Sequence, residues 1–228
     1  MPLRGSAFMA MWHDIAPESE DDYNAWHTIE HMPERLGIPG FLRGRRGVNW
    51  DLDRHRYLTV YESESLASLS SHAYLERLNN PTEWTSRVAP AFRNFLRVAC
   101  ETAHSVGNGV GGAIGTYRID LPNETDAEAW VSRLAMRLAD LMDLPGVCGV
   151  HTAIPRPAHS DIPTTETRIR PEMAEKTFDA LLMVETIGPN ELADADPQVR
   201  ALLGSERVSD VASHQYSMAF LLGRNGDS

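Results

Sequence analysis

The chain has 228 residues, of which 42% are hydrophobic and 23% charged, so it fits one large domain or two modules of about 100 residues each. Its net charge of −11 disfavours a nucleic-acid partner, because phosphate binding requires clustered cations, and the basic cluster "RGRRG" at 43–47 is short. The apolar runs are too short to cross a bilayer, the N-terminus lacks a signal-peptide pattern and the two cysteines form no CxxC motif, which together predict a cytoplasmic protein.

The first half of the chain predicts alternating strands and helices. A β-rich segment at 7–15 precedes a helix expected over 20–32, which starts with a capping box of Ser19 and Asp22. Pro33 should end or kink this helix, because proline lacks a backbone N–H and crowds the preceding turn. Strands at 41–49 and 56–63, a helix at 66–79 and a strand at 93–103 follow. The segment "GNGVGG" at 107–112 is typical of a linker.

The second half repeats this pattern. "LGIPGFLRGRRGV" at 36–48 aligns with "MDLPGVCGVHTAI" at 142–154, and "LTVYES" at 58–63 aligns with "LLMVET" at 181–186. We therefore predict two halves, 1–106 and 113–228, joined by the linker 107–112. An insertion at 155–176 with four prolines predicts a long loop, of the kind that forms lids or packing arms.

Each half has the order βαββαβ, which is the ferredoxin-like arrangement. Two such halves in one chain can pack sheet against sheet. We therefore predict an α+β fold in which tandem ferredoxin-like repeats form an intramolecular dimeric α/β barrel.

The segment "AWHTIEHMPERLGIPGFLRGRRG" has an aromatic residue and a histidine followed by proline on the first helix, with Pro-Gly before the next strand. These positions are Trp26, His31, Pro33, Pro39 and Gly40. The pattern resembles the EthD-like branch of the dimeric α/β-barrel superfamily. The resemblance implies this fold and a functional histidine at His31. It leaves the reaction open, since isomerases, decarboxylases, cyclases, cofactor-free oxygenases and haem enzymes share the superfamily.

The residues His27, Glu30 and His31 also match an H-x-x-E-H pattern, in which two histidines bind zinc and the glutamate acts as a base. A metal would need a third ligand from elsewhere, and Pro33 follows directly. We therefore predict a site without a metal and without an organic cofactor.

A helical wheel gives this helix one apolar stripe, whose members are Ala25, Ile29, Met32 and Leu36. His27 lies opposite the stripe and is predicted to be solvated. Glu30 lies at its flank, where partial burial would raise the pKa unless an arginine such as Arg43 or Arg45 pairs with it. His31 lies in the last turn, where a kink would turn it inward.

Strand alternation supplies further candidates. Arg43 and Arg45 share one face of their strand and Arg46 lies on the other, and the guanidinium groups of either face suit a carboxylate or an enolate. Tyr61 would donate from its hydroxyl, and Tyr74 and Trp84 would form an aromatic wall. The predicted substrate-binding residues are Trp26, Arg43, Arg45, Tyr61 and Trp84.

The first half keeps these polar residues, whereas the second replaces several of them, so we expect one pocket in the first half. We predict a small-molecule enzyme that uses cofactor-independent acid–base catalysis, of the lyase, isomerase or hydrolase type, on a small oxygenated anion. His31 and Glu30 would move protons, assisted by His13. The alternatives are a non-catalytic ligand-binding protein and a metal- or haem-dependent enzyme that uses the H-x-x-E-H helix. A membrane partner is not expected, and two chains could pair as a homodimer.

Overall fold

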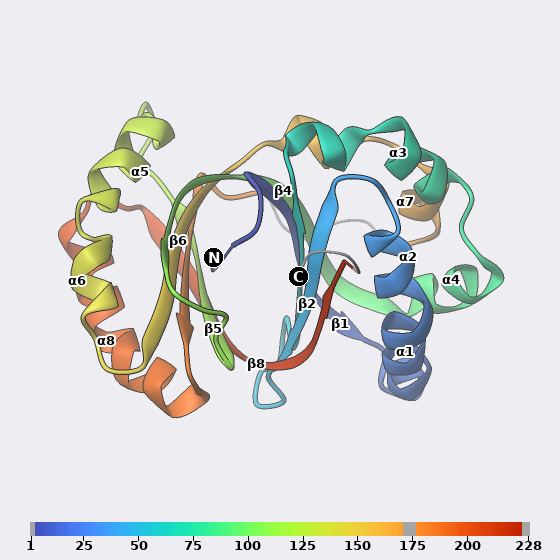
Figure 1. Cartoon of the computed structure of the whole chain (residues 1–228), viewed down its shortest axis with the longest axis horizontal. Helices are drawn as coiled ribbons and strands as arrows, with labels where there is room; N and C mark the ends of the chain where they lie inside the picture. The colour runs from blue at the N-terminus through green and yellow to red at the C-terminus, as the bar shows by residue number, and fades with distance from the viewer. Residues whose placement is uncertain (1–2, 171–176, 225–228) are drawn as a thin grey trace.

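A closed eight-stranded barrel forms the centre of the molecule (Figure 1). The computed structural model describes residues 3–170 and 177–224. Around the barrel the strands follow the order β1-β3-β2-β8-β5-β7-β6-β4, and neighbours are antiparallel. The strands of the first half are β1 (Ala7–Ile15), β2 (Phe41–Val48), β3 (Tyr57–Ser63) and β4 (Phe92–Gly107). Those of the second half are β5 (Ala113–Asp120), β6 (Val147–Pro155), β7 (Ala180–Thr186) and β8 (Asp210–Gly223).

Both halves have the strand order of a ferredoxin-like unit, β4-β1-β3-β2 in the first and β8-β5-β7-β6 in the second. They join at two seams: β2 pairs with β8 and β4 pairs with β6, as in Val48 opposite Ser217 and Val106 opposite Val150. The seams close the sheet, so the barrel has no exposed edge. The predicted fold, tandem ferredoxin-like units packed as an intramolecular α/β barrel, is confirmed.

Helices cover two opposite sides of the barrel (Figure 1). The first half carries α1 (Glu20–Trp26), a π-helical turn (His27–His31), α2 (Met32–Leu36), α3 (His72–Asn79) and α4 (Glu83–Val88). The second half carries α5 (Ala127–Ala135), α6 (Leu138–Met142) and α8 (Pro189–Ser205). The short helix α7 (Thr165–Ile169) belongs to the second half in sequence but lies beside α3 of the first half. None of the helices in the described ranges has the length and apolar character needed to cross a membrane.

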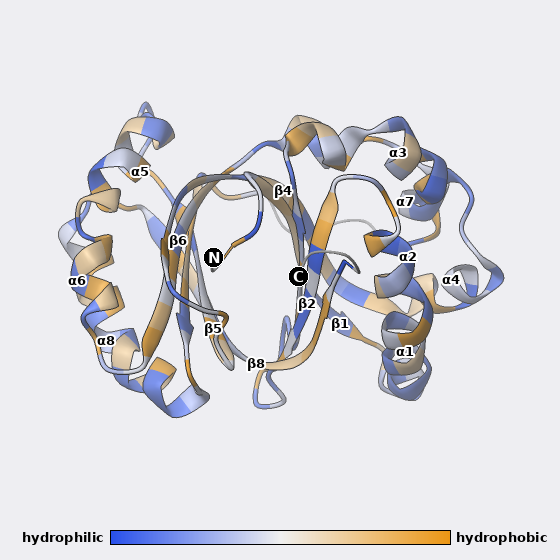
Figure 2. Cartoon of the chain, viewed as in Figure 1, coloured by the Kyte–Doolittle hydropathy of each residue, from blue (hydrophilic) through white to orange (hydrophobic). Residues whose placement is uncertain are grey.

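The core has three parts. One lies between the first sheet and its helices, one lies between the second sheet and its helices, and one fills the barrel. Strands β1, β3 and β7 are buried along their whole length, because one of their faces meets the helices or the second-half core and the other meets the barrel interior. Figure 2 shows apolar and hydrophilic residues alternating along the outer helices, as expected for helices that bury one face.

Several predicted elements differ from the structure. Ser19 forms no capping hydrogen bond, so the predicted capping box is absent, and the helix predicted over 66–79 is divided into a 3-10 turn (Leu66–Ser70) and α3. The helix that Pro33 was predicted to end or kink widens to a π-helical turn before Pro33 and continues to Leu36. The insertion predicted as a loop contains a 3-10 turn (Pro157–His159) and helix α7, which a capping box at Thr164 starts. Residues 171–176 of that insertion lie outside the described residues.

Candidate active site

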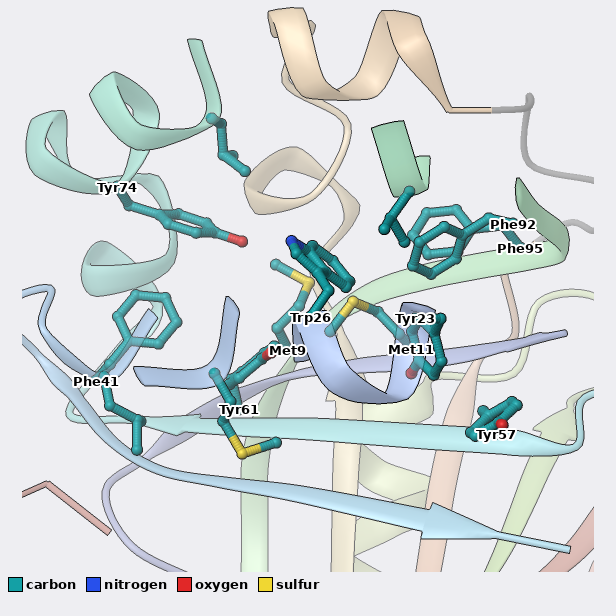
Figure 3. Close-up of a cluster of buried hydrophobic side chains, with 14 of the residues drawn as sticks. Met9, Met11, Tyr23, Trp26, Phe41, Tyr57, Tyr61, Tyr74, Phe92 and Phe95 are labelled. Carbon is teal, nitrogen blue, oxygen red and sulfur yellow. The ribbon is translucent and has the colours of Figure 1, made fainter. Parts of the chain in front are cut away.

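Four of the predicted site residues meet between the first sheet and its helices. His13 on β1 and Tyr61 on β3 point toward the helices, where they meet His31 of the π-helical turn and Trp26 at the end of α1. The side chains of His13, His31 and Tyr61 are 1%, 4% and 1% exposed. Figure 3 shows Trp26 and Tyr61 within this cluster, together with Tyr23, Tyr74 and Phe92.

The π-helical turn brings His27 into the same space. Its wide turn is closed by the Met32 N–H, which donates to the carbonyl of His27 five residues earlier. Pro33 has no N–H to donate to the carbonyl of Ile29, and a wide turn relieves the crowding there. The wide turn changes the direction in which the side chains point around the helix axis. As a result His27 is 3% exposed and Ile29 is 67% exposed. The predicted solvated position of His27 and the predicted burial of Ile29 are therefore wrong.

Two of the histidines each form a hydrogen bond with a tyrosine hydroxyl, in a direction that the tautomer of the ring decides. The Tyr61 hydroxyl lies 3.3 Å from Nε2 of His27, and the Tyr23 hydroxyl lies 3.2 Å from Nε2 of His13. Burial raises the pKa of both tyrosines, which keeps their hydroxyl groups protonated and able to donate. His31 instead stacks on Trp26, with the ring centroids 4.1 Å apart.

The remaining ring nitrogens of these histidines are unusual. Nδ1 of His13, His27 and His31 is buried and has no hydrogen-bond partner among the described residues. Burial lowers the pKa of all three, bringing that of His13 to about 3. After burial, the group that lowers the pKa most is Arg35 for His31 and Arg46 for His27. The site thus holds neutral imidazoles with free nitrogen atoms beside buried positive charge.

Sequence reasoning missed Arg35 and Arg97 and gave Arg46 only as a candidate on the face opposite Arg43 and Arg45. Arg35 on α2 and Arg97 on β4 lie 5.8 and 6.0 Å from the centroid of the Tyr74 ring, and Nη2 of Arg97 donates to the Tyr74 hydroxyl over 3.1 Å. Arg46 on β2 faces the helices, where Nη2 donates to Thr28 over 3.1 Å. Arg46 is 7% exposed, lies over the Phe220 ring at 5.8 Å and forms no ion pair among the described residues, so no carboxylate neutralises its charge.

Helix α7 closes this space. Glu166 pairs with Nη2 of Arg35 at 2.5 Å and with Arg170, and it is 2% exposed. The cavity between these side chains leaves about 10 Å³ for the centre of a water molecule, which is about the room that one water needs. Its lining residues are Met11, His31, Arg35, Tyr61, Tyr74, Leu78, Arg97, Glu166, Thr167 and Arg170.

Arg43 and Arg45 do not reach this site. They lie on the opposite face of β2, inside the barrel, where Glu62 binds both guanidinium groups at 2.8 and 2.9 Å. Glu185 of β7 binds Nη1 of Arg45 at 2.7 Å. The face is set by Gly44, because a side chain there would collide with Met32 and Tyr61 on the helix side. The two arginines therefore form a buried ionic network between the halves and not a substrate contact beside His31.

Glu30 and Trp84 also point away. Glu30 is half-buried and accepts a hydrogen bond from the Thr82 hydroxyl at 2.6 Å. The Trp84 indole donates to Asp22 at 2.9 Å, on the outer side of α1 and α4. Glu30 thus has a hydroxyl partner instead of the predicted arginine, and neither side chain lines the cavity beside His31.

The donor atoms do not suit a metal or a haem. His27 and His31 face the sheet while Glu30 faces Thr82, so the H-x-x-E-H residues do not converge, and no other metal-ligating cluster occurs in the described ranges. A haem would need a wide apolar cavity beside His31, whereas the wall there carries the charges of Arg35, Arg97 and Glu166.

The described residues of the second half form no equivalent site. Its buried histidine and charged side chains, as far as the structure describes them, either face the barrel interior or belong to the segment that carries α7. These residues are Arg118, His151, Glu185 and Glu166. The helix-facing core of this half is largely aliphatic. The side chains able to do chemistry therefore gather on the first half.

Solved structures share this fold. A proposed monooxygenase from Fusobacterium nucleatum is 9% identical, with 97% of this chain and 96% of that chain covered and a TM-score of 0.62. An anthrone oxidase-like protein is 12% identical, with 96% and 93% covered and a TM-score of 0.63. A proposed monooxygenase from Lactobacillus acidophilus is 8% identical, with 97% of both chains covered and a TM-score of 0.61. At these identities the likeness shows the dimeric α/β-barrel fold.

No protein-family model and no curated protein sequence matches the chain.

Proposed function

We propose that this protein is a small-molecule enzyme that binds an oxygenated anion between the first sheet and its helices and transfers a proton without an organic cofactor. The observation that carries the proposal is the group of three buried neutral histidines, each with an unpartnered Nδ1, beside the buried positive charges of Arg35 and Arg46. Buried polar atoms are normally paired, and exceptions gather at functional sites.

An anion would change the histidines it meets. Arg35 lowers the pKa of His31 in the closed site, and a bound negative charge would offset that effect. The imidazole would then become a stronger base at the moment when substrate is present. Tyr61 remains protonated. In the tautomer in which Nε2 of His27 carries the hydrogen and donates to the Tyr61 oxygen, the Tyr61 hydroxyl would donate its own hydrogen to the oxygen on which charge develops.

The histidines would divide the work by position. His31 lines the cavity and is proposed to take the proton, while His27 holds Tyr61 through its Nε2. Trp26 is a positioning residue, because it covers the His31 ring and donates to Thr85 at 3.2 Å. His13 lies deeper, stacked on Tyr57 at 5.3 Å, and would only assist. Glu30 is left out, since its carboxylate is turned toward Thr82.

Exchange of carbon-bound hydrogen with D₂O, followed by NMR, tests proton transfer before the product is known. The panel would contain small carboxylates, β-keto acids and phenols, each paired with a neutral analogue of the same size. At least one anionic compound should exchange in the presence of the protein, and its neutral analogue should not. Absence of exchange across the whole panel would count against an acid–base enzyme and favour a binding protein.

A second candidate is oxidation of the same bound anion by dioxygen. Its support is the likeness to proteins described as proposed monooxygenases and as anthrone oxidase-like, together with the aromatic lining of the site. Removal of a proton by His31 would give an electron-rich carbanion that can react with oxygen. Oxygen uptake with any compound that exchanges hydrogen would support this candidate. Hydrogen exchange without oxygen uptake would favour the cofactor-free acid–base enzyme proposed first.

A further inference from the structure

The segment between β6 and β7 crosses from the second half to the first and covers the site. Strand β6 ends at Pro155. Shortly after it, Nδ1 of His159 and the Ser70 hydroxyl form a hydrogen bond of 2.9 Å. Farther along, the backbone N–H of Thr165 donates to Asn79 at 3.1 Å. Figure 1 shows α7 beside α2 and α3, on the far side of the barrel from α5, α6 and α8.

This segment places a carboxylate on Arg35. Glu166 accepts from Nη2 of Arg35 at 2.5 Å and also pairs with Arg170, four residues later on the same segment. Burial acts to raise the pKa of Glu166, but the charges of Arg170 and Arg35 outweigh it, so the pKa lies below its usual value and Glu166 is ionised. A buried carboxylate on a guanidinium group is the contact by which proteins recognise carboxylate ligands.

Little apolar contact holds α7 in place. Glu166 is the one buried residue among the five described residues of the helix. The Ser160 carbonyl of the segment accepts from Nη1 of Arg97 at 2.6 Å, and the Arg170 guanidinium group lies over the rings of Phe92 and Phe95 at 4.9 and 5.1 Å. A buried ion pair adds little net stability, and an incoming carboxylate would restore the same contacts to Arg35.

Withdrawal of α7 would leave few charges unpaired. Glu166 would keep Arg170, because both lie on the moving segment. Arg35 would keep Glu34, whose carboxylate lies 3.1 Å from Nη1. The space vacated by Glu166 is continuous with the wall made by Tyr61, Tyr74 and His31, since all line one cavity.

We infer that Arg35, with Arg97 beside it, is the subsite for a substrate carboxylate, and that Glu166 occupies it as an internal competitor until the substrate displaces α7. The inference rests on the proposed function, because it names the charged group of that substrate. A carboxylate on Arg35 would direct the rest of the ligand toward His31.

Calorimetric titration with benzoate and with neutral benzamide tests the inference on the full chain. Glu166→Gln removes the competing charge and should tighten benzoate binding at least tenfold, with no comparable gain for benzamide. Asp161→Asn, an exposed carboxylate on the same segment, is the matched control and should bind benzoate like the wild type. Adding Arg35→Gln to Glu166→Gln should abolish the gain.

A second variant covers the case in which Glu166→Gln does not fold. Thr164→Ala removes the cap of α7 without touching a charge, and should tighten benzoate binding about threefold. In the wild type, benzoate should speed amide hydrogen exchange at 164–170 at least tenfold. Unchanged benzoate affinity in the variant that folds, or an equal gain for benzamide, would overturn the inference. Turnover does not enter this readout, so its failure and a failure of proton transfer at His31 would be seen separately.

Discussion

The rings of Trp26 and His31 lie 4.1 Å apart, and the indole N–H of Trp26 is anchored by the Thr85 hydroxyl at 3.2 Å. One hydroxyl on α4 thus fixes the tryptophan that covers the proposed base. The link runs from a helix on the outside of the first half to the ring that lines the cavity.

Thr85→Val should test this link. The change keeps the shape but leaves the buried Trp26 N–H unpaired, which should lower the free energy of unfolding by about 1–3 kcal/mol. It should also slow hydrogen exchange of any substrate found. Urea unfolding gives the first effect, and Ser86→Ala, an exposed position on the same helix, should change neither. Full stability in Thr85→Val would show that the hydrogen bond does not hold Trp26.

Acid should destabilise the protein through its buried histidines. The pKa of His13, His27 and His31 lies below 6.5 in the folded state, so below that pH the unfolded chain binds protons that the folded chain does not. Above about pH 6.5 the histidines are neutral in both states, and the free energy of unfolding has its full value. As the pH falls below that, the free energy of unfolding decreases, by up to about 1.4 kcal/mol per pH unit for each histidine.

The free energy of unfolding between pH 7.5 and 5 measures this slope. His27→Asn should reduce it, whereas His72→Asn, at an exposed position, should not. The same slope in His27→Asn as in the wild type would mean that His27 is not held neutral by its surroundings.

Arg46→Met should separate stability from electrostatics. Methionine has a similar volume, and replacing a buried charge that lacks a carboxylate partner should leave stability unchanged or raise it. Removing this charge should also raise the pKa of His27, because Arg46 lowers that pKa more than any other cause except burial. NMR titration of His27 checks the second effect. A pKa that stays in place would contradict the assignment of Arg46 to the site.

Glu185→Gln should show that Arg45 serves the barrel. Arg45 lies 2.7 Å from Glu185, which also contacts His151 at 3.1 Å, and loss of the carboxylate leaves the guanidinium group poorly compensated. The cost should be about 3–5 kcal/mol in urea unfolding. Glu128→Gln is the control. The Glu128 carboxylate is 67% exposed and pairs with Arg156, and losing this pair should cost under about 1 kcal/mol. Equal, small losses would place Arg45 outside the stabilising network.

The sequence was sufficient for the fold because its strands carry strong local signals. Strand β1 spans the predicted 7–15, and the repeat of strand and helix patterns gives the order that closes the barrel. The helical wheel failed at the π-helical turn, because a wide turn changes the direction of the side chains around the helix axis. His27 is therefore buried and Ile29 exposed, the reverse of what the wheel predicted. Pro33 was the available signal, because a helix can pass a proline when the preceding turn is widened.

The site was only partly predictable. His13, His31, Trp26 and Tyr61 converge, although the helical wheel places His31 away from the apolar stripe and its inward position was predicted from Pro33 and the family resemblance. Alternation showed that Arg43 and Arg45 share a face, but it could not tell which face looks into the barrel. The contact between Arg35 and Glu166 joins residues 131 positions apart and depends on the path of the segment before α7, which no local pattern encodes.

The central claim is that His31 accepts the proton. The most direct measurement is the rate of hydrogen exchange into D₂O for the best compound of the panel, compared between the wild type and His31→Asn. Asparagine keeps a polar side chain of related shape but removes the base, so exchange should fall by about 10²–10⁴-fold while the unfolding midpoint changes little. His72→Asn should retain the wild-type rate. Exchange that persists in His31→Asn at the wild-type rate would contradict the account.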